Sequence, residues 1–394
     1  MTRKAVSPCD MSQLNEFPAY QFRLIRFCGV VEQPSLRNNV RCLFAFILLC
    51  SFGPLHVWYL AKTPVLDLVV TCEEIMLIQL CFVMLLKFNL FITYRSGMYN
   101  LVEAFKRILK CIDKAEFARF VKCSELHAKL LRAYVIGTSI VLLLYELNAI
   151  VASITLSLQQ NKVCFVTPFS FPFDYQHPFV FALTFLHNFD AMLVTVCTSV
   201  TVDSCFSEMA SNLTIHFDIV RERFEKLDLS AAQPYAEHQL RNVITYHREV
   251  LSLAQKMVQL YQQSAFYLLL LVSTILCLLG YEFVMVSNIY KRMQVAILAS
   301  IMIGQAAIYT YHGSAISAKS VSVADAIYGT NWYDAPLAVK KLVYICLTRA
   351  QKPVIMKSGF IEASLPTLKK ILSSSASYIT MLMSLEADLN EKKT

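Results

Sequence analysis

Cysteine and histidine are the side chains that enzyme and metal sites use most often, and this chain holds 13 cysteines and eight histidines. None of them stands at an informative spacing, because there is no C-x-x-C pair and no histidine follows a cysteine at metal-ligand spacing. The H-E-x-x-H, G-x-S-x-G and glycine-rich phosphate-loop patterns do not occur either. We therefore expect no catalytic residues, no metal ligands and no cofactor.

Serines near the C-terminus suggest another chemistry, the wetting of a path for ions. Six residues recur at a heptad-like spacing that places them along one helix face: Ser374, Ser377, Tyr378, Met381, Ser384 and Leu385. Small serines could simply allow helices to pack closely. Alternatively, one such helix from each subunit could line a pore, with serines wetting the path and a ring containing Met381 and Leu385 closing it by dewetting.

Charged side chains also occur inside apolar stretches, where they are costly and are functional candidates by default. We expect four carboxylates to face water between helices or to pair with Lys87 or His187: Glu73, Glu146, Asp190 and Glu282.

Long apolar helices must position these groups. Hydrophobic residues make up 56% of the 394 residues and charged residues only 16%, whereas soluble domains usually carry about 25% charge. Crossing a bilayer takes about 20 apolar residues. Seven stretches fit, the last being the weakest: Val40–Leu60, Leu66–Tyr94, Tyr134–Leu158, Phe179–Cys205, Ser264–Ser287, Met293–Ile316 and Leu365–Leu385. The predicted fold class is an all-α integral membrane protein with seven transmembrane helices.

The basic residues predict the direction of these spans, since cytosolic connections carry an excess of Lys and Arg. With the N-terminus inside, 29 of the 36 Lys and Arg lie in cytosolic segments and six lie outside. The N-terminus is therefore predicted to be cytosolic and the C-terminus extracellular. Because the basic residues fall between apolar runs, we expect no nucleic-acid binding. The sequon Asn212-Leu213-Thr214 would face the cytosol and stay unmodified.

This direction argues against a G-protein-coupled receptor, whose N-terminus lies outside. The third span also lacks an Asp-Arg-Tyr-like end, and no Asn-Pro-x-x-Tyr occurs. A transporter would show internal repeats or paired broken helices, which we do not find.

Two cytosolic connections are predicted to be helical. In residues 206–262, a helix that starts at Gln233-Pro234 carries an apolar stripe from Leu240 to Tyr261 and leads into the fifth span. The stripe could pack on its own subunit or join subunits below the membrane. In residues 317–364, a short helix spans Ala338–Arg349 and ends before Lys352-Pro353, after which Ser364 caps the last helix.

The C-terminal half resembles the insect odorant receptor family. The similar strings are Ser322-Val323-Ala324-Asp325-Ala326-Ile327-Tyr328 with Trp332-Tyr333, Arg349-Ala350-Gln351-Lys352-Pro353, Gly359-Phe360, Ser364-Leu365 and Ser377-Tyr378-Ile379-Thr380-Met381-Leu382, together with His247. These matches cover the last 150 residues, whereas the first 230 agree only in span number, polarity and length.

The resemblance implies a heterotetrameric cation channel in which an odorant-binding subunit assembles with a coreceptor subunit. It implies a cytosolic anchor domain built from the helical extensions. The last helix would line the pore, with Met381 and Leu385 at a hydrophobic gate and Ser377 and Ser384 as polar neighbours. The Val-rich, Gln-containing ending and the long intracellular insert of the coreceptor are absent here, so the chain resembles a tuning subunit. Gustatory-type channels of the same superfamily remain an alternative, although their Thr-Tyr and Gln-Phe endings are lacking.

The implied domain organisation has seven parts. These are a cytosolic segment (1–39), four spans (40–205), cytosolic extensions (206–262), two spans (263–316), an anchor region (317–364), a pore-lining helix (365–387) and an extracellular tail (388–394). The implied location is the plasma membrane of olfactory sensory neurons, where the partners are the coreceptor, a small volatile odorant and membrane lipid.

In this family the ligand lies in the outer half of the bundle, between the second and sixth spans. An apolar pocket with one or two polar groups would suit a volatile ligand. The candidate residues are Ile78, Tyr145, Asn148, Phe181, Phe185, Asn188, Tyr281, Ser300 and Ile301.

Overall fold

The computed structural model describes residues 26, 28–30, 35–62, 68–160, 173, 177–230 and 233–391. Helices dominate this part of the chain: α3 (Leu36–Lys62), α4 (Leu68–Thr93), α5 (Arg95–Leu109), α6 (Lys114–Gln160), α7 (Pro178–Glu225), α8 (Gln233–Met285), α9 (Ile289–Tyr328), α10 (Leu337–Ala350) and α11 (Leu365–Glu391). A 3₁₀ turn, η1 (Trp332–Asp334), precedes α10. A small hairpin precedes α11, in which β1 (Lys357–Ser358) pairs antiparallel with β2 (Ile361–Glu362), Lys357 opposite Glu362.

Five helices in the described ranges are long and apolar enough to cross a membrane, namely α3, α4, α7, α8 and α9. Helices α6 and α11 cover the third and seventh predicted spans. The chain is thus an all-helical, multi-pass membrane protein. The count of seven spans and the sides on which the termini lie stay predictions.

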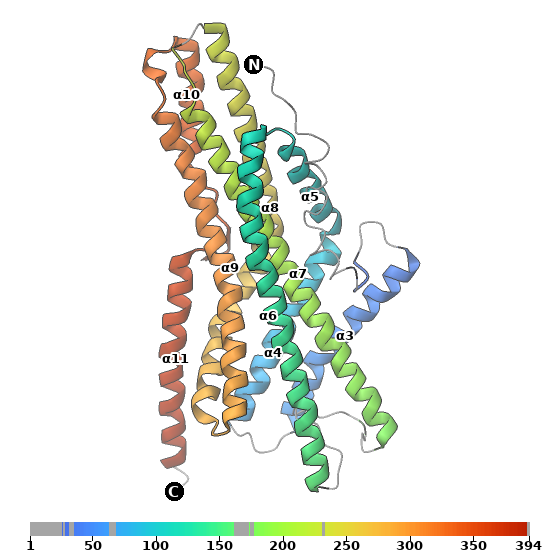
Figure 1. Ribbon diagram of the computed structural model, residues 1–394. Coiled ribbons are helices and arrows are strands. Elements are labelled where there is room, and N and C mark those ends of the chain that lie inside the picture. The colour runs from blue at the N-terminus through green and yellow to red at the C-terminus, as the bar shows by residue number, and fades with distance from the viewer. Residues whose placement is uncertain are drawn as a thin grey trace.

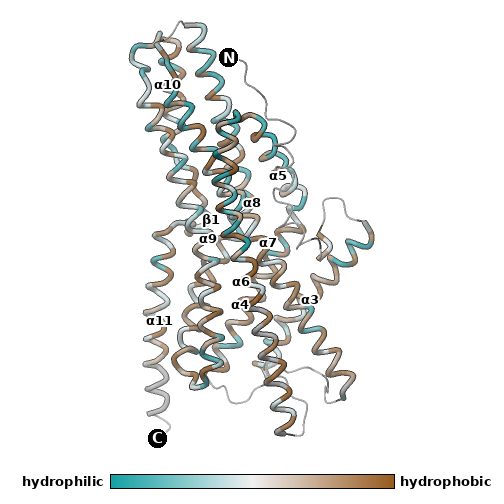
Figure 2. The backbone as a smooth tube through the Cα atoms, in the orientation of Figure 1, coloured by the Kyte–Doolittle hydropathy of each residue, from teal (hydrophilic) through white to brown (hydrophobic). Residues whose placement is uncertain are grey.

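Several helices are much longer than a bilayer is thick. Helix α8 has 53 residues and α7 has 48, which at about 1.5 Å per residue gives about 80 and 72 Å. The hydrocarbon core is only about 30 Å thick. Figure 1 shows these helices continuing past α3, α4 and α11 into a second region that ends at α10, and Figure 2 shows hydrophilic residues gathering there.

Local sequence signals place the helix ends. Pro178 and Pro234 stand in the first turns of α7 and α8, where the missing N–H costs no helical bond. The Asn288 side chain caps α9 by accepting from the backbone N–H groups of Tyr290 and Lys291. The start at Gln233 agrees with the prediction, and α10 is one residue longer at each end than predicted. Ser364 directly precedes α11, and its carbonyl accepts from the N–H of Leu368.

The apolar stripe of α8 packs inside its own chain. Its residues are buried: Leu240, Val243, His247, Val250, Leu251, Ala254, Met257 and Tyr261. Of the two uses predicted for it, packing on its own subunit is therefore the one observed. Aromatic contacts continue this core, since Phe206 of α7 stacks on Tyr309 of α9 at 4.5 Å between ring centroids and contacts Tyr261 at 5.2 Å.

Asn212 of the sequon lies in this core. It is buried in the middle of α7, and its Nδ2 donates to Glu208 Oε1. The side chain of this asparagine is therefore not on the surface of the folded chain.

Candidate functional site

Helix α11 packs on α8 along one narrow face. Ile371 and Ser375 are buried there, and the Ser375 hydroxyl lies 3.0 Å from the carbonyl oxygen of Ser273. One turn further along α11, Ile379 lies so close to Gly280 of α8 that a Cβ at Gly280 would overlap the Ile379 side chain. Glycine therefore sets the distance between the two helices at this height.

The opposite face of α11 is uncovered. Ser377, Met381 and Ser384 are exposed, with Met381 58% exposed. The hydroxyl of Ser377 donates to the carbonyl of Ser373 and that of Ser384 to the carbonyl of Met381, so their oxygen lone pairs remain available to accept. Figure 1 shows α11 along the edge of the bundle. The side chain of Leu385 lies outside the described residues.

The predicted odorant-site residues are spread over several helices. On α7, Phe181, Phe185 and Asn188 are half-buried, as is Ile78 on α4. The others are distributed as follows: Tyr281 is fully buried in α8, Ser300 is exposed on α9, Ile301 packs against the core, and the side chains of Tyr145 and Asn148 on α6 lie outside the described residues.

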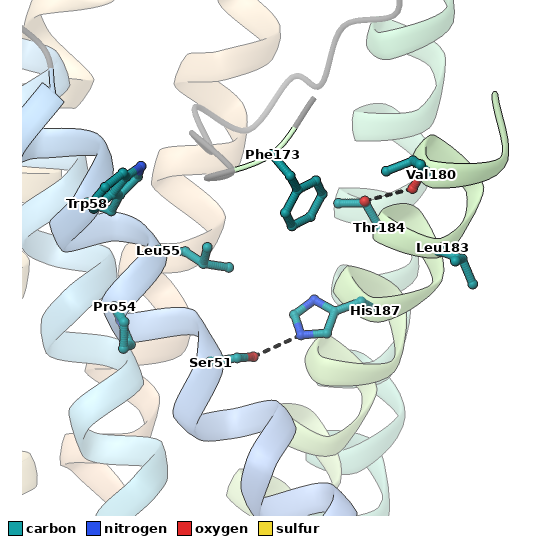
Figure 3. Close-up of a pocket in the computed structure, with 9 residues that line it drawn as sticks. All are labelled: Ser51, Pro54, Leu55, Trp58, Phe173, Val180, Leu183, Thr184 and His187. Carbon is teal, nitrogen blue, oxygen red and sulfur yellow. Dashed lines mark hydrogen bonds between the residues drawn. The ribbon is translucent and has the colours of Figure 1, made fainter. Parts of the chain in front are cut away.

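A crevice lies beside these residues, between α3 and α7, with a volume of about 650 Å³. Its lining residues are Ser51, Pro54, Leu55, Trp58, Phe173, Val180, Leu183, Thr184 and His187 (Figure 3). None of the predicted odorant-site residues lines it. Sequence analysis missed the contribution of α3, because an apolar span gives no sign of which of its faces meets another helix.

A buried ion pair joins α4 and α7 inside the bundle. Lys87 Nζ lies 2.8 and 2.9 Å from the two carboxylate oxygens of Asp203 and 3.1 Å from the hydroxyl of Ser199. The hydroxyl groups of Tyr309 on α9 and Tyr134 on α6 also donate to Asp203, at 3.0 and 3.4 Å. Four helices therefore meet at one carboxylate.

This pairing corrects the prediction for Lys87, whose partner is none of the four carboxylates expected. Lys291 of α9 instead pairs with Glu73 of α4 and with Glu282 of α8. His187 contacts the hydroxyl of Ser51 at 2.8 Å. Asp203 was overlooked because it stands at the end of the fourth predicted span, where a carboxylate reads as an ordinary boundary residue.

A second charged contact joins α6 and α7. Arg223 of α7 donates to both carboxylate oxygens of Glu116 on α6, at 2.8 and 2.6 Å, and to the carbonyl of Cys111 at 2.9 Å. Its guanidinium lies 4.0 Å from the ring centre of Tyr246 on α8. Such bidentate, stacked geometry is specific to arginine.

Comparison with known proteins decides the family. The sequence profile of the 7tm odorant receptor family matches residues 67–376. The chain belongs to the insect odorant receptor family. This is a family of receptors and channels rather than of enzymes.

Curated relatives and solved structures agree with this assignment. Odorant receptor 82a of Drosophila melanogaster is 25% identical over 315 residues, which cover 76% of this chain and 80% of that protein. Odorant receptor 9a of the same species is 29% identical over 221 residues, 55% of each chain. The insect olfactory receptor OR5 of Machilis hrabei, solved in complex with eugenol, superposes with a TM-score of 0.82 at 14% identity, over 95% of this chain and 100% of that one. At that identity the likeness concerns the odorant receptor fold alone.

Proposed function

We propose that this chain is the odorant-binding, tuning subunit of a cation channel that it forms with a coreceptor subunit. The uncovered face of α11 is the observation that carries the proposal. That face presents Ser377, Met381 and Ser384 on a helix predicted to span the membrane, at the edge of the bundle.

A lipid environment does not favour such a face, because hydroxyl oxygens find no donors among acyl chains. Facing an aqueous path, the same oxygens accept from water, and Met381 supplies an apolar ring that can close by dewetting. A path of this kind needs several copies of α11 around one axis. The proposal therefore requires an oligomer, a tetramer in the family that the sequence resembles.

Exposed apolar residues at the other end of the molecule support assembly. On α10, Leu337, Tyr344 and Ile345 are 70%, 71% and 66% exposed. In a region that extends beyond the membrane, such side chains indicate a surface that a partner covers. Subunit contact below the membrane is therefore assigned to α10 in this proposal, rather than to the buried stripe of α8.

The odorant is proposed to bind in the outer half of the bundle, among Ile78, Tyr145, Asn148, Phe181, Phe185, Asn188, Tyr281, Ser300 and Ile301. An odorant of about ten heavy atoms gains roughly 7 kcal/mol at about 0.7 kcal/mol per atom. This corresponds to a dissociation constant on the order of 10 μM. Binding opens the channel only to the extent that the odorant prefers the open state.

Current recording in oocytes tests the proposal. The chain is expressed alone and with an insect coreceptor, and an odorant panel is applied at the plasma membrane. Odorant-evoked cation current that requires both subunits and persists under G-protein blockade is the expected result. Current that disappears under G-protein blockade would refute the channel mechanism.

A further inference from the structure

The crevice between α3 and α7 has the size and lining of a small-molecule site. Its volume of about 650 Å³ falls within the range of roughly 300–1,000 Å³ that is usual for such sites. Trp58, Phe173 and Leu183 are 41%, 49% and 53% exposed at its walls. Both α3 and α7 are candidate spans, so the crevice lies between two helices that are expected to contact the bilayer, where apolar molecules concentrate.

Around Ser51, the hydrogens are already used in hydrogen bonds, whereas an oxygen lone pair can still accept one. The Ser51 oxygen lies 2.8 Å from the carbonyl oxygen of Leu48 and 2.8 Å from Nε2 of His187. Two oxygens this close repel unless a hydrogen lies between them, so the single Ser51 hydrogen goes to Leu48. This arrangement favours the tautomer in which His187 donates from Nε2 to Ser51, with Nδ1 3.4 Å from Oδ1 of Asn188, and it leaves a lone pair on the Ser51 oxygen (Figure 3).

Thr184 adds a second oxygen that can accept a hydrogen bond but has no hydrogen left to donate. The hydroxyl of Thr184 gives its hydrogen to the carbonyl of Val180, at 2.8 Å. Ser51 and Thr184 therefore offer lone pairs, while their hydroxyl hydrogens and the Nε2 hydrogen of His187 are already used; the indole N–H of Trp58 is a further side-chain donor in the lining.

We propose that the crevice between α3 and α7 is a second ligand site, which binds small apolar alcohols and phenols in preference to ethers, esters and ketones of the same shape. The apolar walls hold the hydrocarbon part, and the hydroxyl group donates to the oxygen of Ser51 or Thr184. A ligand that can only accept finds no free donor on Ser51, Thr184 or His187 and can form a hydrogen bond only with the indole N–H of Trp58, so it loses the bond that a hydroxyl group makes to Ser51 or Thr184. The site is separate from the proposed odorant-site residues, none of which lines it.

A chain of side-chain contacts connects the crevice with the rest of the bundle. The His187 ring stacks on Phe52 at 5.9 Å between centroids, and Phe52 lies 6.3 Å from His56. His56 Nδ1 lies 2.7 Å from Glu74 of α4, and both side chains are buried. A ligand that fixes the position of α3 relative to α7 therefore also affects the contact between α3 and α4.

Trp58 provides a direct assay, because the chain has only two tryptophans and the other, Trp332, lies in η1 next to α10. Bromine quenches tryptophan fluorescence on contact. The full-length chain in lipid nanodiscs is titrated with 4-bromophenol and, in parallel, with 4-bromoanisole, in which a methyl group replaces the hydroxyl hydrogen and removes the donor. The same titrations with Trp58→Phe isolate the signal of Trp58. Thr184→Val removes an acceptor from the crevice, and Thr195→Val is its matched control, since Thr195 makes the same bond to the carbonyl of Ala191 elsewhere on α7.

We expect saturable quenching of Trp58 by 4-bromophenol, with 4-bromoanisole about five-fold weaker, as expected for one lost neutral hydrogen bond. The double variant Thr184→Val with Ser51→Ala should remove that difference, and Thr195→Val should keep it. Equal quenching by both compounds in the unchanged chain would overturn the proposal. Phospholipids with brominated acyl chains give a second test: if they quench Trp58 and phenol without bromine does not relieve that quenching, lipid fills the crevice and the proposal is overturned. Odorant-evoked current through the channel is a separate readout, so loss of this site leaves the proposed function standing.

Discussion

At the scale of single residues, buried charges are satisfied by partners from other helices. Lys87 is 1% exposed and Asp203 fully buried, and each would be left without a counter-charge if the other were removed. Breaking a buried pair on one side costs about 3–5 kcal/mol, since the remaining charge stays desolvated. The Lys106–Glu103 pair of α5 is half-exposed and is expected to contribute little.

Lys87→Met should therefore lower the stability of the folded chain by about 3–5 kcal/mol and reduce its amount at the cell surface. Thermal unfolding in detergent and surface biotinylation measure the two effects. Lys106→Met is the control and should change stability by less than about 1 kcal/mol. A Lys87→Met chain as stable as the control would show that the ion pair is dispensable.

Burial also controls thiol reactivity. Cys346 is buried on α10 beside His247, and burial raises the pKa of its thiol to about 11. Below the unfolded pKa of about 8.5, the thiol is protonated in both the folded and the unfolded chain, and its burial does not lower the free energy of unfolding. As pH rises toward 11, the unfolded chain loses the thiol proton first, so the free energy of unfolding falls. At neutral pH, chains that keep only Cys346 should react with maleimide far more slowly than chains that keep only the exposed Cys123. Mass spectrometry of the adducts follows the rates, and comparable rates would mean that α10 opens readily.

At the scale of elements, the contact between α8 and α11 determines where the proposed pore face lies. Gly280 permits the close approach of Ile379, and the uncovered residues lie on the far side of α11. A larger side chain at this position of α8 would push α11 away from its own bundle, toward the proposed pore axis.

Gly280→Ala should consequently narrow the pore and reduce the maximal odorant-evoked current at unchanged surface expression. Combining it with Ile379→Val removes the overlapping methyl group and should restore part of the current. Gly304→Ala on α9 is the control, because a Cβ there meets open space. Whole-cell currents in the presence of the coreceptor measure all three, and a normal current from Gly280→Ala would contradict the proposed position of the axis.

The gate itself is tested on the same helix. Met381→Ser makes the constriction wettable, so current in the absence of odorant should rise. Met383→Ser changes a residue of similar exposure outside the Ser377, Met381 and Ser384 face and should leave that basal current unchanged. If both variants behave alike, Met381 does not face the pore.

At the scale of the whole molecule, long helices connect a membrane region with a second region that ends at α10. The sidedness of this arrangement is the prediction on which the functional proposal depends. Cys111 and Cys123 are exposed and flank the start of α6, on a connection predicted to be cytosolic.

A membrane-impermeant maleimide should label these two cysteines only after the cells are permeabilised. Cys164, in a connection predicted to be extracellular, should be labelled on intact cells and serves as the internal control. Labelling of Cys111 on intact cells would reverse the predicted topology.

The sequence by itself determined the helical class, the places of the long apolar helices, the breaks at Pro234 and Pro353, and the resemblance to the family. Whether a segment crosses a membrane is a local property of about 20 residues, and caps and prolines act within one turn. The partner of Lys87 lies 116 residues away, and in the crevice between α3 and α7 Ser51 contacts His187, which lies 136 residues away. Only the tertiary structure decided these contacts. A span that is apolar on all sides carries no pattern that separates the face toward protein from the face toward lipid, so the pairing of its faces depends on how complete helices pack.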